Sequence, residues 1–259
     1  MSERRFTFND VATLYGEIRP TYPDEVFDDI IAAAELAADG RILEIGCGTG
    51  QATLGFAARG LAVVALDPGA ELIRLARDNL AGFPAVRFVE TTFEGWDAGP
   101  ARFTLVVAAQ SLHWVQPEIR LAKAADVLAP EGFLAVFANV PMPIPSPLGK
   151  NIAEIYARYA PSLSGPSAEA WYLPDGPFAA ELYRSERFEQ PWQRRYAWSR
   201  THSAKSYTDL LRTLSGHRLL APEQLETLLG AIADAIDAHG GQFELQYETH
   251  LYMARRVGG

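Results

Sequence analysis

Residues 41–50 read Arg-Ile-Leu-Glu-Ile-Gly-Cys-Gly-Thr-Gly, a short apolar run that ends in three glycines at alternate positions. The apolar part predicts a strand, because Ile42, Leu43 and Ile45 suit a strand that is covered on both faces. Glycine accepts positive φ and lets bare backbone approach a ligand closely. The stretch therefore predicts a buried strand that ends in a tight, ligand-binding turn.

The spacing of the glycines narrows the kind of ligand. A P-loop needs Gly-Lys-Ser/Thr after four intervening residues, whereas Gln51 and Ala52 follow Gly50 here. A dinucleotide fingerprint places its third glycine three residues after the second, and this position is Gln51. Both alternatives are disfavoured, although a NAD(P)-dependent oxidoreductase is kept as a rival interpretation.

Strands and helices alternate after the glycine turn. The patterns predict helices over 52–58, 70–81 and 117–128 and strands over 61–67, 86–90, 103–109 and 133–140. Such alternation is typical of an α/β protein with a doubly wound, mostly parallel sheet. Beyond Pro141 the alternation stops, and helices are predicted around 149–159, 177–186, 204–214 and 222–239. Residues 193–200 and 243–255 alternate in the manner of antiparallel edge strands.

Composition limits the partners. The formal net charge of −9 opposes binding to nucleic acid, which depends on lysine and arginine at phosphates. No apolar run approaches the roughly 20 residues that span a bilayer, and the start of the sequence lacks an apolar signal segment, so we expect no membrane partner and a cytoplasmic protein.

The single cysteine, Cys47, excludes an internal disulfide. The five histidines lack metal-ligand spacing, so no metal is expected.

Three strand ends carry groups that could bind an adenosine. Ligands of open parallel sheets lie beyond the carboxyl ends of the strands. The glycine turn would offer backbone N–H groups, Asp67 could accept hydrogen bonds from a ribose, and residues 92–94 (Thr-Phe-Glu) could flank a base. Asp67 precedes Pro68 and Gly69, and an Asp in that setting also commonly starts a turn. Its place after the second strand favours the ribose.

Three segments together resemble the class I S-adenosylmethionine-dependent methyltransferases. They are residues 43–50 (Leu-Glu-Ile-Gly-Cys-Gly-Thr-Gly), 64–67 (Val-Ala-Leu-Asp) and 128–133 (Leu-Ala-Pro-Glu-Gly-Phe). Tyr15, residues 19–23 (Arg-Pro-Thr-Tyr-Pro) and 111–114 (Ser-Leu-His-Trp) resemble the small-molecule type 11 branch, near the trans-aconitate and ubiquinone/menaquinone-pathway enzymes. The resemblance implies a seven-stranded Rossmann-like sheet with an antiparallel C-terminal hairpin and a helical cap insertion.

The resemblance also implies an organisation of the chain. The N-terminal arm and first helix would occupy 1–40, the S-adenosylmethionine-binding core 41–140 and the cap insertion 141–188, and residues 189–259 would complete the sheet and cap. The implied cofactor-binding residues are Tyr15, Arg19, Glu44, Gly46, Cys47, Gly48, Gly50, Asp67, Pro68, Thr92, Phe93, Glu94, Ala109 and Gln110. Arg19 would pair with the methionine carboxylate and Tyr15 would close over it. Many relatives have an acid where Thr92 stands and Asp where Thr104 stands, so the contact to the adenine amine could fall to Thr92 or Glu94.

The acceptor is predicted only by class. The expected reaction is direct transfer of a methyl group to a small organic molecule, with S-adenosylhomocysteine as product; a non-catalytic S-adenosylmethionine-binding protein is a second rival. His113 is the candidate base or acceptor-orienting group, and its alternative role is to fix the loop after the fourth parallel strand. The other candidate acceptor contacts are Tyr22, Trp114, Trp171, Tyr207 and Arg218. Neither the acceptor nor the oligomeric state follows from the sequence.

Overall fold

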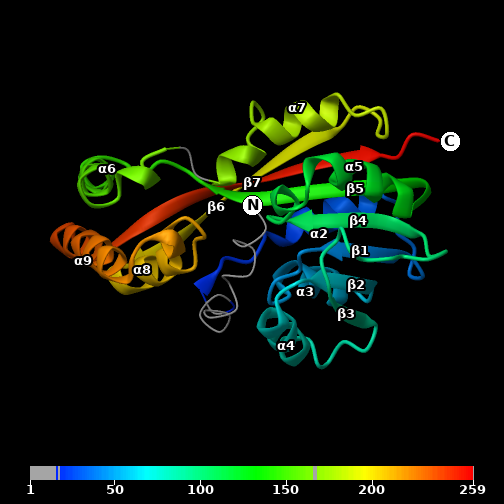
Figure 1. Cartoon of the computed structure of the whole chain (residues 1–259), viewed down its shortest axis with the longest axis horizontal. Helices are drawn as coiled ribbons and strands as arrows, with labels where there is room; N and C mark the ends of the chain where they lie inside the picture. Colours follow the sequence, from blue (N-terminus) through cyan, green and yellow to red (C-terminus); the bar gives the residue numbers. More distant parts are fainter. Residues whose placement is uncertain (1–15, 17, 166–167, 259) are drawn as a thin grey trace.

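The computed structural model describes residues 16, 18–165 and 168–258, and its centre is one seven-stranded sheet (Figure 1). The strand order is β3-β2-β1-β4-β5-β7-β6. The strands are β1 (Arg41–Ile45), β2 (Ala62–Asp67), β3 (Val86–Glu90), β4 (Phe103–Ala109), β5 (Leu128–Pro141), β6 (Trp192–Ser203) and β7 (Gln242–Arg255). β1 to β5 pair in parallel, and β7 pairs antiparallel with both β5 and β6. The predicted Rossmann-like sheet is confirmed.

Helices cover both faces of the parallel part of the sheet. They are α2 (Asp24–Ala33), α3 (Gln51–Ala57) and α4 (Ala70–Asn79), then α5 (Pro117–Val127) and α7 (Pro177–Tyr183). Phe27 of α2 and Phe56 of α3 pack on one face with Ile42 of β1. Leu43, the next residue of β1, lies in the core on the other face with Phe178 of α7. This division follows from strand geometry, in which successive side chains point to opposite faces.

The predicted antiparallel pairing of the two C-terminal strands is confirmed. β6 and β7 pair along their whole length, from Trp192 opposite Met253 to Ser203 opposite Gln242. As predicted, helices lie between them in the chain: α8 (Ala204–Arg212), η6 (His217–Leu219) and α9 (Pro222–Ala238). The prediction of an edge position is wrong for β7, because it lies between β5 and β6. The near-continuous apolar run at 251–254 (Leu-Tyr-Met-Ala) fits this position, since all four residues are buried.

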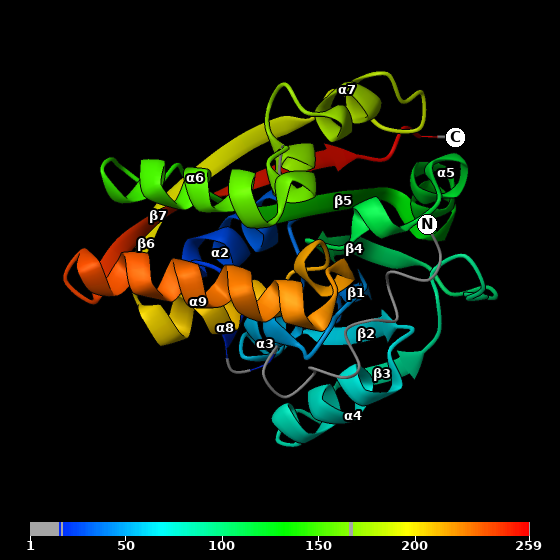
Figure 2. The same cartoon turned by 60° about the vertical axis from the view of Figure 1, so that its left-hand side comes forward.

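The cap consists of α6 (Leu148–Tyr159), α8 and α9, which lie together near one end of the long strands β6 and β7 (Figures 1 and 2). Its core joins Ile152 of α6, Leu211 of α8 and Ile232 of α9. α7, which the prediction assigns to the same insertion, packs instead against the sheet through buried Phe178. The cap therefore draws its helices from two separated segments of the chain, 148–159 and 204–238.

The glycine turn has the backbone that its sequence predicts. Gly46 has φ of +70° and Gly50 has φ of +92°, both in the left-handed region that favours glycine. A Cβ on Gly46 would lie 2.5 Å from the Cβ of Ser111, so this position also lacks room for a side chain. The N–H groups of Gly46 and Cys47 both donate to the carbonyl oxygen of Leu66, which fixes the turn to the end of β2. In the described part of the chain, no helix is both long and apolar enough to cross a membrane.

Candidate functional site

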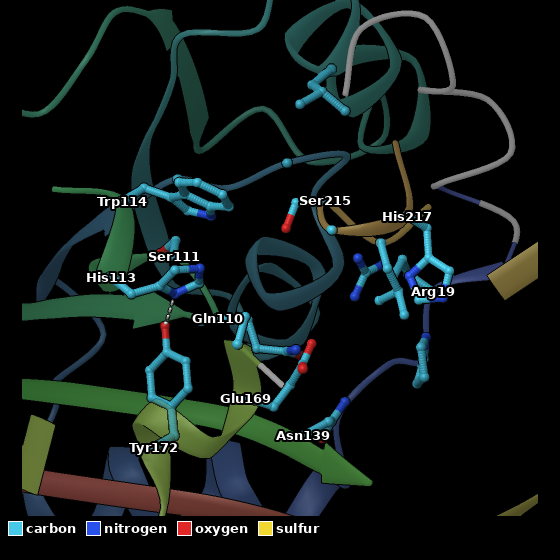
Figure 3. Close-up of a pocket in the computed structure, with 18 of the residues that line it drawn as sticks. Arg19, Gln110, Ser111, His113, Trp114, Asn139, Glu169, Tyr172, Ser215 and His217 are labelled. Atoms are coloured by element: carbon cyan, nitrogen blue, oxygen red, sulfur yellow. Dashed lines mark hydrogen bonds between the residues drawn. The ribbon is translucent and has the colours of Figure 1, made fainter. Parts of the chain in front are cut away.

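A cavity of about 650 Å³ lies between the carboxyl ends of β1, β2 and β4 and the cap (Figure 3). Residues of the sheet and residues of the cap both line this cavity. Ten of the predicted cofactor residues are among its walls, namely Arg19, Gly46, Gly48, Asp67, Pro68, Thr92, Phe93, Glu94, Ala109 and Gln110. The cap side contributes residues of α6, α8 and η6. The site is thus positioned where ligands of open α/β sheets bind.

Asp67 ends β2 beside the glycine turn. Its Oδ2 accepts the N–H of Gly48 at 2.9 Å, and its Oδ1 accepts the N–H of Gly69 at 2.8 Å. The residue is 7% exposed, and this burial raises the pKa of its carboxyl to about 6. Each carboxylate oxygen has a second lone pair. Asp67 can therefore hold the turn and still accept hydrogen bonds from a ligand's hydroxyl groups, so the turn-forming and ligand-binding interpretations are compatible.

Glu44 lies under the turn and does not line the main cavity. Its Oε2 accepts the hydroxyl of Thr53 at 2.6 Å, while its buried Oε1 has no hydrogen-bond partner among the residues that the structure describes. Burial raises the pKa of its carboxyl to about 7. Glu44 borders a small adjoining cleft of about 30 Å³ together with Arg19, Cys47 and Gln51. An unsatisfied buried carboxylate oxygen is costly, so this cleft is suited to a hydrogen-bond donor such as an ammonium group.

The predicted base-binding segment forms one side of the cavity, and its side chains also contact their own loop or α5. The Thr92 Oγ1 accepts the N–H of Gly95 at 3.1 Å. Phe93 is buried, and the ammonium group of Lys123 lies 5.3 Å from the centre of its ring. The Glu94 Oε1 accepts the N–H of Gln116 at 3.3 Å. All three still line the cavity.

Arg19 connects the two halves of the site. Its Nη2 donates to the carbonyl oxygen of Thr213, at the end of α8, at 2.9 Å, and the residue borders both the main cavity and the small cleft. Gln110, at the end of β4, has φ of +53° and accepts the hydroxyl of Tyr22 at 3.2 Å. Positive φ in a residue with a side chain is strained and concentrates at functional sites. Tyr15, predicted to close over the cofactor, lies outside the described residues.

Two predicted cofactor residues occupy different places from those expected. Cys47 borders only the small cleft, where it is buried between two glycines. Gly50 is the N-cap of α3 and borders neither space, because a Cβ there would point at Leu80 of α4. Gly50 therefore allows α3 and α4 to pack closely, rather than contacting a ligand in the cavity.

His113 lies on the short helix η3 (Leu112–Trp114), directly after β4, and lines the cavity. Its Nδ1 is 2.7 Å from the hydroxyl oxygen of Tyr172, on η5 (Ala168–Tyr172), as the dashed line in Figure 3 shows. Burial, with the positive charges of Arg120 and Arg19, lowers the pKa of His113 to about 4. The imidazole is therefore neutral at pH 7 and a weak base. The bond to Tyr172 also fixes the loop, so both predicted roles of His113 are structurally available.

The other predicted acceptor residues divide into three groups. Trp114 and Tyr207 line the main cavity, and Tyr22 borders only the small cleft. Trp171 is not among the lining residues; its ring packs 4.9 Å from that of Tyr172, behind the cavity wall. Arg218 is also absent from the walls, and its neighbour His217 is present instead. Adjacent side chains of a 3₁₀ helix diverge by about a third of a turn, which explains why only one of these two faces the cavity.

Sequence reasoning missed several cavity residues on the cap. They are Tyr156 of α6, Glu169 and Tyr172 of η5, His217 of η6 and Tyr247 of β7, that is, residues of the cap and of the segments beside it. No local motif surrounds these residues, because they come together only when distant segments of the chain pack against one another. The sequence patterns near these residues predict helices around 149–159 and 204–214. Those helices indicate a cap but do not indicate which helix faces point into the cavity.

Comparison with known proteins finds similarity to methyltransferases. Residues 42–132 match the methyltransferase domain model. An uncharacterised methyltransferase of Mycobacterium tuberculosis is 34% identical over 133 residues, which are 51% of this chain and 52% of that protein. A trans-aconitate 2-methyltransferase of Paracidovorax citrulli is 32% identical over 42% of each chain. The chain thus spans about half the length or less of these curated relatives. The glycine turn and Asp67 lie within the residues 42–132 that match the domain model.

Structural similarity extends over more of the chain. A putative type II methyltransferase from Anaeromyxobacter dehalogenans superposes with a TM-score of 0.59 over 92% of this chain and 97% of its own. The two sequences are 22% identical, so this likeness concerns the fold alone. The shared architecture includes the sheet. The likeness does not identify an acceptor for this chain.

Proposed function

We propose that the protein transfers a methyl group from S-adenosylmethionine to a small organic acceptor, a proposal that the match of residues 42–132 to the methyltransferase domain model supports. The observation that carries the proposal is one continuous cavity with two kinds of wall. On the sheet side lie the glycine turn and Asp67, and on the cap side lie Tyr207 and other ring and leucine side chains. A cofactor and a small acceptor could be bound there together, away from bulk water.

The residues around the turn fit this cofactor. Asp67 has lone pairs left for two ribose hydroxyls, and the unpartnered Oε1 of Glu44 suits the ammonium of the methionine part. Arg19, which borders the same small cleft, would bind the carboxylate. Phe93 and Glu94 would flank the adenine. When bound, S-adenosylmethionine supplies a methyl group on a positively charged sulfur, which the acceptor takes by direct in-line displacement with S-adenosylhomocysteine as the product.

The protein's own contribution to the rate would be mainly positioning. Orientation of two bound reactants can supply much of the acceleration of a bimolecular reaction. His113 and Gln110 lie at the end of β4, where the sheet and cap sides of the cavity meet, and would orient the acceptor atom.

A NAD(P)-dependent oxidoreductase is the rival function, and calorimetric titration with both cofactors tests it. Binding of NADH without binding of S-adenosylmethionine would favour the oxidoreductase.

Cofactor binding is expected to release protons. The free Glu44 and Asp67 carboxyls have pKa values of about 7 and about 6, so both are partly protonated near pH 6.5. A bound ammonium and ribose favour the ionised carboxylates and lower both pKa values, so the affinity for S-adenosylmethionine should rise from about pH 5.5 to about pH 7.5 and then level off. Titration calorimetry in buffers of different ionisation enthalpy measures the released protons. Glu44→Gln should reduce their number, and an affinity that falls with rising pH would contradict this assignment.

His113→Gln is expected to lower kcat by about tenfold, a small effect for a histidine in a reaction site. A strong general base contributes about 10²–10⁴-fold and has a pKa near the working pH, whereas the pKa of His113 is lowered to about 4. Because the imidazole stays neutral, it should produce no break in the kcat profile between about pH 5.5 and pH 8. Tyr172→Phe, which removes the hydroxyl partner, should have a similar effect. A loss of about 10³-fold, together with disappearance of a break near pH 6.5, would instead show that His113 is an essential base.

A further inference from the structure

Two histidine–tyrosine pairs line the cavity from opposite sides. His113 and Tyr172 form the first pair, next to the end of β4. Tyr156 of α6 and His217 of η6 form the second, with 2.7 Å between the Tyr156 hydroxyl and the His217 Nε2. Figure 3 shows His217 beside Arg19, across the cavity from His113 and Tyr172. The proposed methyl transfer uses the first pair and leaves the second without a role.

The second pair retains hydrogen-bonding capacity toward the cavity. A tyrosine hydroxyl can donate one hydrogen bond and accept two, and each nitrogen of a neutral imidazole can make one. Neither Tyr156 nor His217 has a second side-chain hydrogen bond with the residues that the structure describes. Both residues line the cavity. Polar groups with spare capacity in an enclosed space favour a ligand that carries a matching polar group.

Much of the lining on this side of the cavity is apolar, although Ser162, Glu169 and Ser215 also belong to the wall. Its apolar members are five leucines and two tyrosine rings: Leu163, Leu210, Leu211, Leu214, Leu245, Tyr207 and Tyr247. A ligand that reaches from His113 to His217 passes along this wall. A largely hydrocarbon or aromatic body suits these contacts, because a polar group placed against the leucines and rings would lose its hydration without gaining a partner.

The charges around the cavity do not suit a polycarboxylate. Within the described ranges, Arg19 is the only lysine or arginine on the cavity wall, and it also borders the cleft assigned to the cofactor carboxylate. Glu169, on the cap side, adds a negative charge. His217 is buried, and burial followed by the charge of Arg19 lowers its pKa to about 4, so it adds no positive charge at pH 7. Each carboxylate of an acceptor needs a cation or several donors when it is removed from water.

We propose that the Tyr156–His217 pair recognises an uncharged hydroxyl or carbonyl group at the far end of an elongated, apolar acceptor that lacks carboxylates. This inference rests on the proposed function, because it assumes that the methylated atom lies near His113. It assigns the specificity of the site to the cap, and it separates this protein from its relatives that are named for trans-aconitate. Tyr156 and His217 are recognition residues here and take no part in the chemical step.

The test is calorimetric binding to the full chain saturated with S-adenosylhomocysteine. The probes are 4-alkylphenols of increasing chain length, the same phenols with a terminal hydroxyl, and trans-aconitate. At the matching length, the terminal hydroxyl should increase affinity about tenfold, and Tyr156→Phe should abolish that increase while leaving the affinity for the plain alkylphenol unchanged. Tyr159→Phe is the matched control, because Tyr159 lies on the same helix but is not on the cavity wall. It should keep the tenfold preference.

Three outcomes would overturn the inference. In the first, the wild-type protein binds the two phenol series with equal affinity. In the second, the preference for the terminal hydroxyl survives Tyr156→Phe. In the third, trans-aconitate binds more tightly than every phenol. Absence of phenol binding to the S-adenosylhomocysteine complex counts as the first of these. The cofactor titration is made beforehand and separately, so a failure of the proposed function would appear as absent S-adenosylhomocysteine binding before any phenol is added.

Discussion

Asp67→Ala is expected to lower the affinity for S-adenosylmethionine by about 100-fold or more. The substitution removes a buried carboxylate that accepts two backbone N–H groups and, in the proposed complex, two ribose hydroxyls. Hydrogen bonds to a charged group contribute about 1.5–3 kcal/mol each, and every 1.4 kcal/mol corresponds to tenfold in affinity. The loss of two such bonds to the ribose accounts for the expected change, which titration calorimetry measures directly.

Asp97→Ala provides a matched control for this prediction. The Asp97 Oδ1 accepts the N–H of Gly99, two residues later, at 2.8 Å, in the same local arrangement as Asp67 with Gly69. Asp97 is not on the cavity wall, so its loss should leave cofactor affinity within about twofold of wild type. If Asp67→Ala remains folded and binds the cofactor as tightly as Asp97→Ala does, Asp67 is only a turn-forming residue and the proposed ribose contact is wrong.

Glu181→Ala is expected to lower the free energy of unfolding by about 3–5 kcal/mol. Glu181 of α7 forms a two-point ion pair with Arg120 of α5, in which the Arg120 Nε donates to Oε1 at 2.7 Å and Nη2 bonds Oε2. The Arg120 side chain is only 8% exposed, so removal of Glu181 leaves a buried charge without its partner. Breaking one side of a buried pair has this cost because the remaining charge is not rehydrated. Chemical denaturation of both proteins measures the difference.

A control and a rescue variant distinguish this cause from general damage to α7. Asp126→Ala breaks the exposed pair of Asp126 with Arg187 and should cost at most about 1 kcal/mol. Replacing both partners, as in Arg120→Met with Glu181→Leu, should recover most of the stability, because no unpaired charge remains. A loss below about 1 kcal/mol for Glu181→Ala, or no recovery in the double variant, would show that the pair contributes little to the fold.

The same ion pair supports the reaction site indirectly. The Arg120 guanidinium lies 4.8 Å from the centre of the Trp171 ring, and Trp171 packs against both His113 and Tyr172. This stack explains why Trp171, predicted to contact the acceptor, stands behind the wall instead. Its large ring is used to hold the His113–Tyr172 pair in place.

Much of the sheet could be predicted from the sequence, because its signals are local. The predicted strands over 86–90 and 103–109 have the observed bounds, and the glycine turn and Asp67 meet as their positions after β1 and β2 require. Each of these predictions depends on a short run of residues and on the rule that parallel strand ends share one edge.

The cap could be predicted only as helices, because its inner face depends on packing between distant segments. Tyr156 and His217 are 61 residues apart and meet only when α6 and η6 pack together. Arg218 and Trp171 are predicted from their placement in the cap segment of the sequence, whereas burial and the direction of the side chain decide which residues face the cavity. The predicted insertion 141–188 includes α7, which packs on the sheet, whereas α8 and α9 of the cap lie in the segment 189–259 that is expected to complete the sheet and cap.

Transfer of a labelled methyl group tests the central claim most directly. The full chain would be incubated with methyl-labelled S-adenosylmethionine and a pooled set of small phenols, quinone precursors and organic acids, with Asp67→Ala in parallel. We predict label in an uncharged, organic-extractable product with the wild-type protein and at least a tenfold smaller yield with Asp67→Ala. Binding of S-adenosylmethionine without transfer to any compound, or transfer that is equal in the two proteins, would contradict the account.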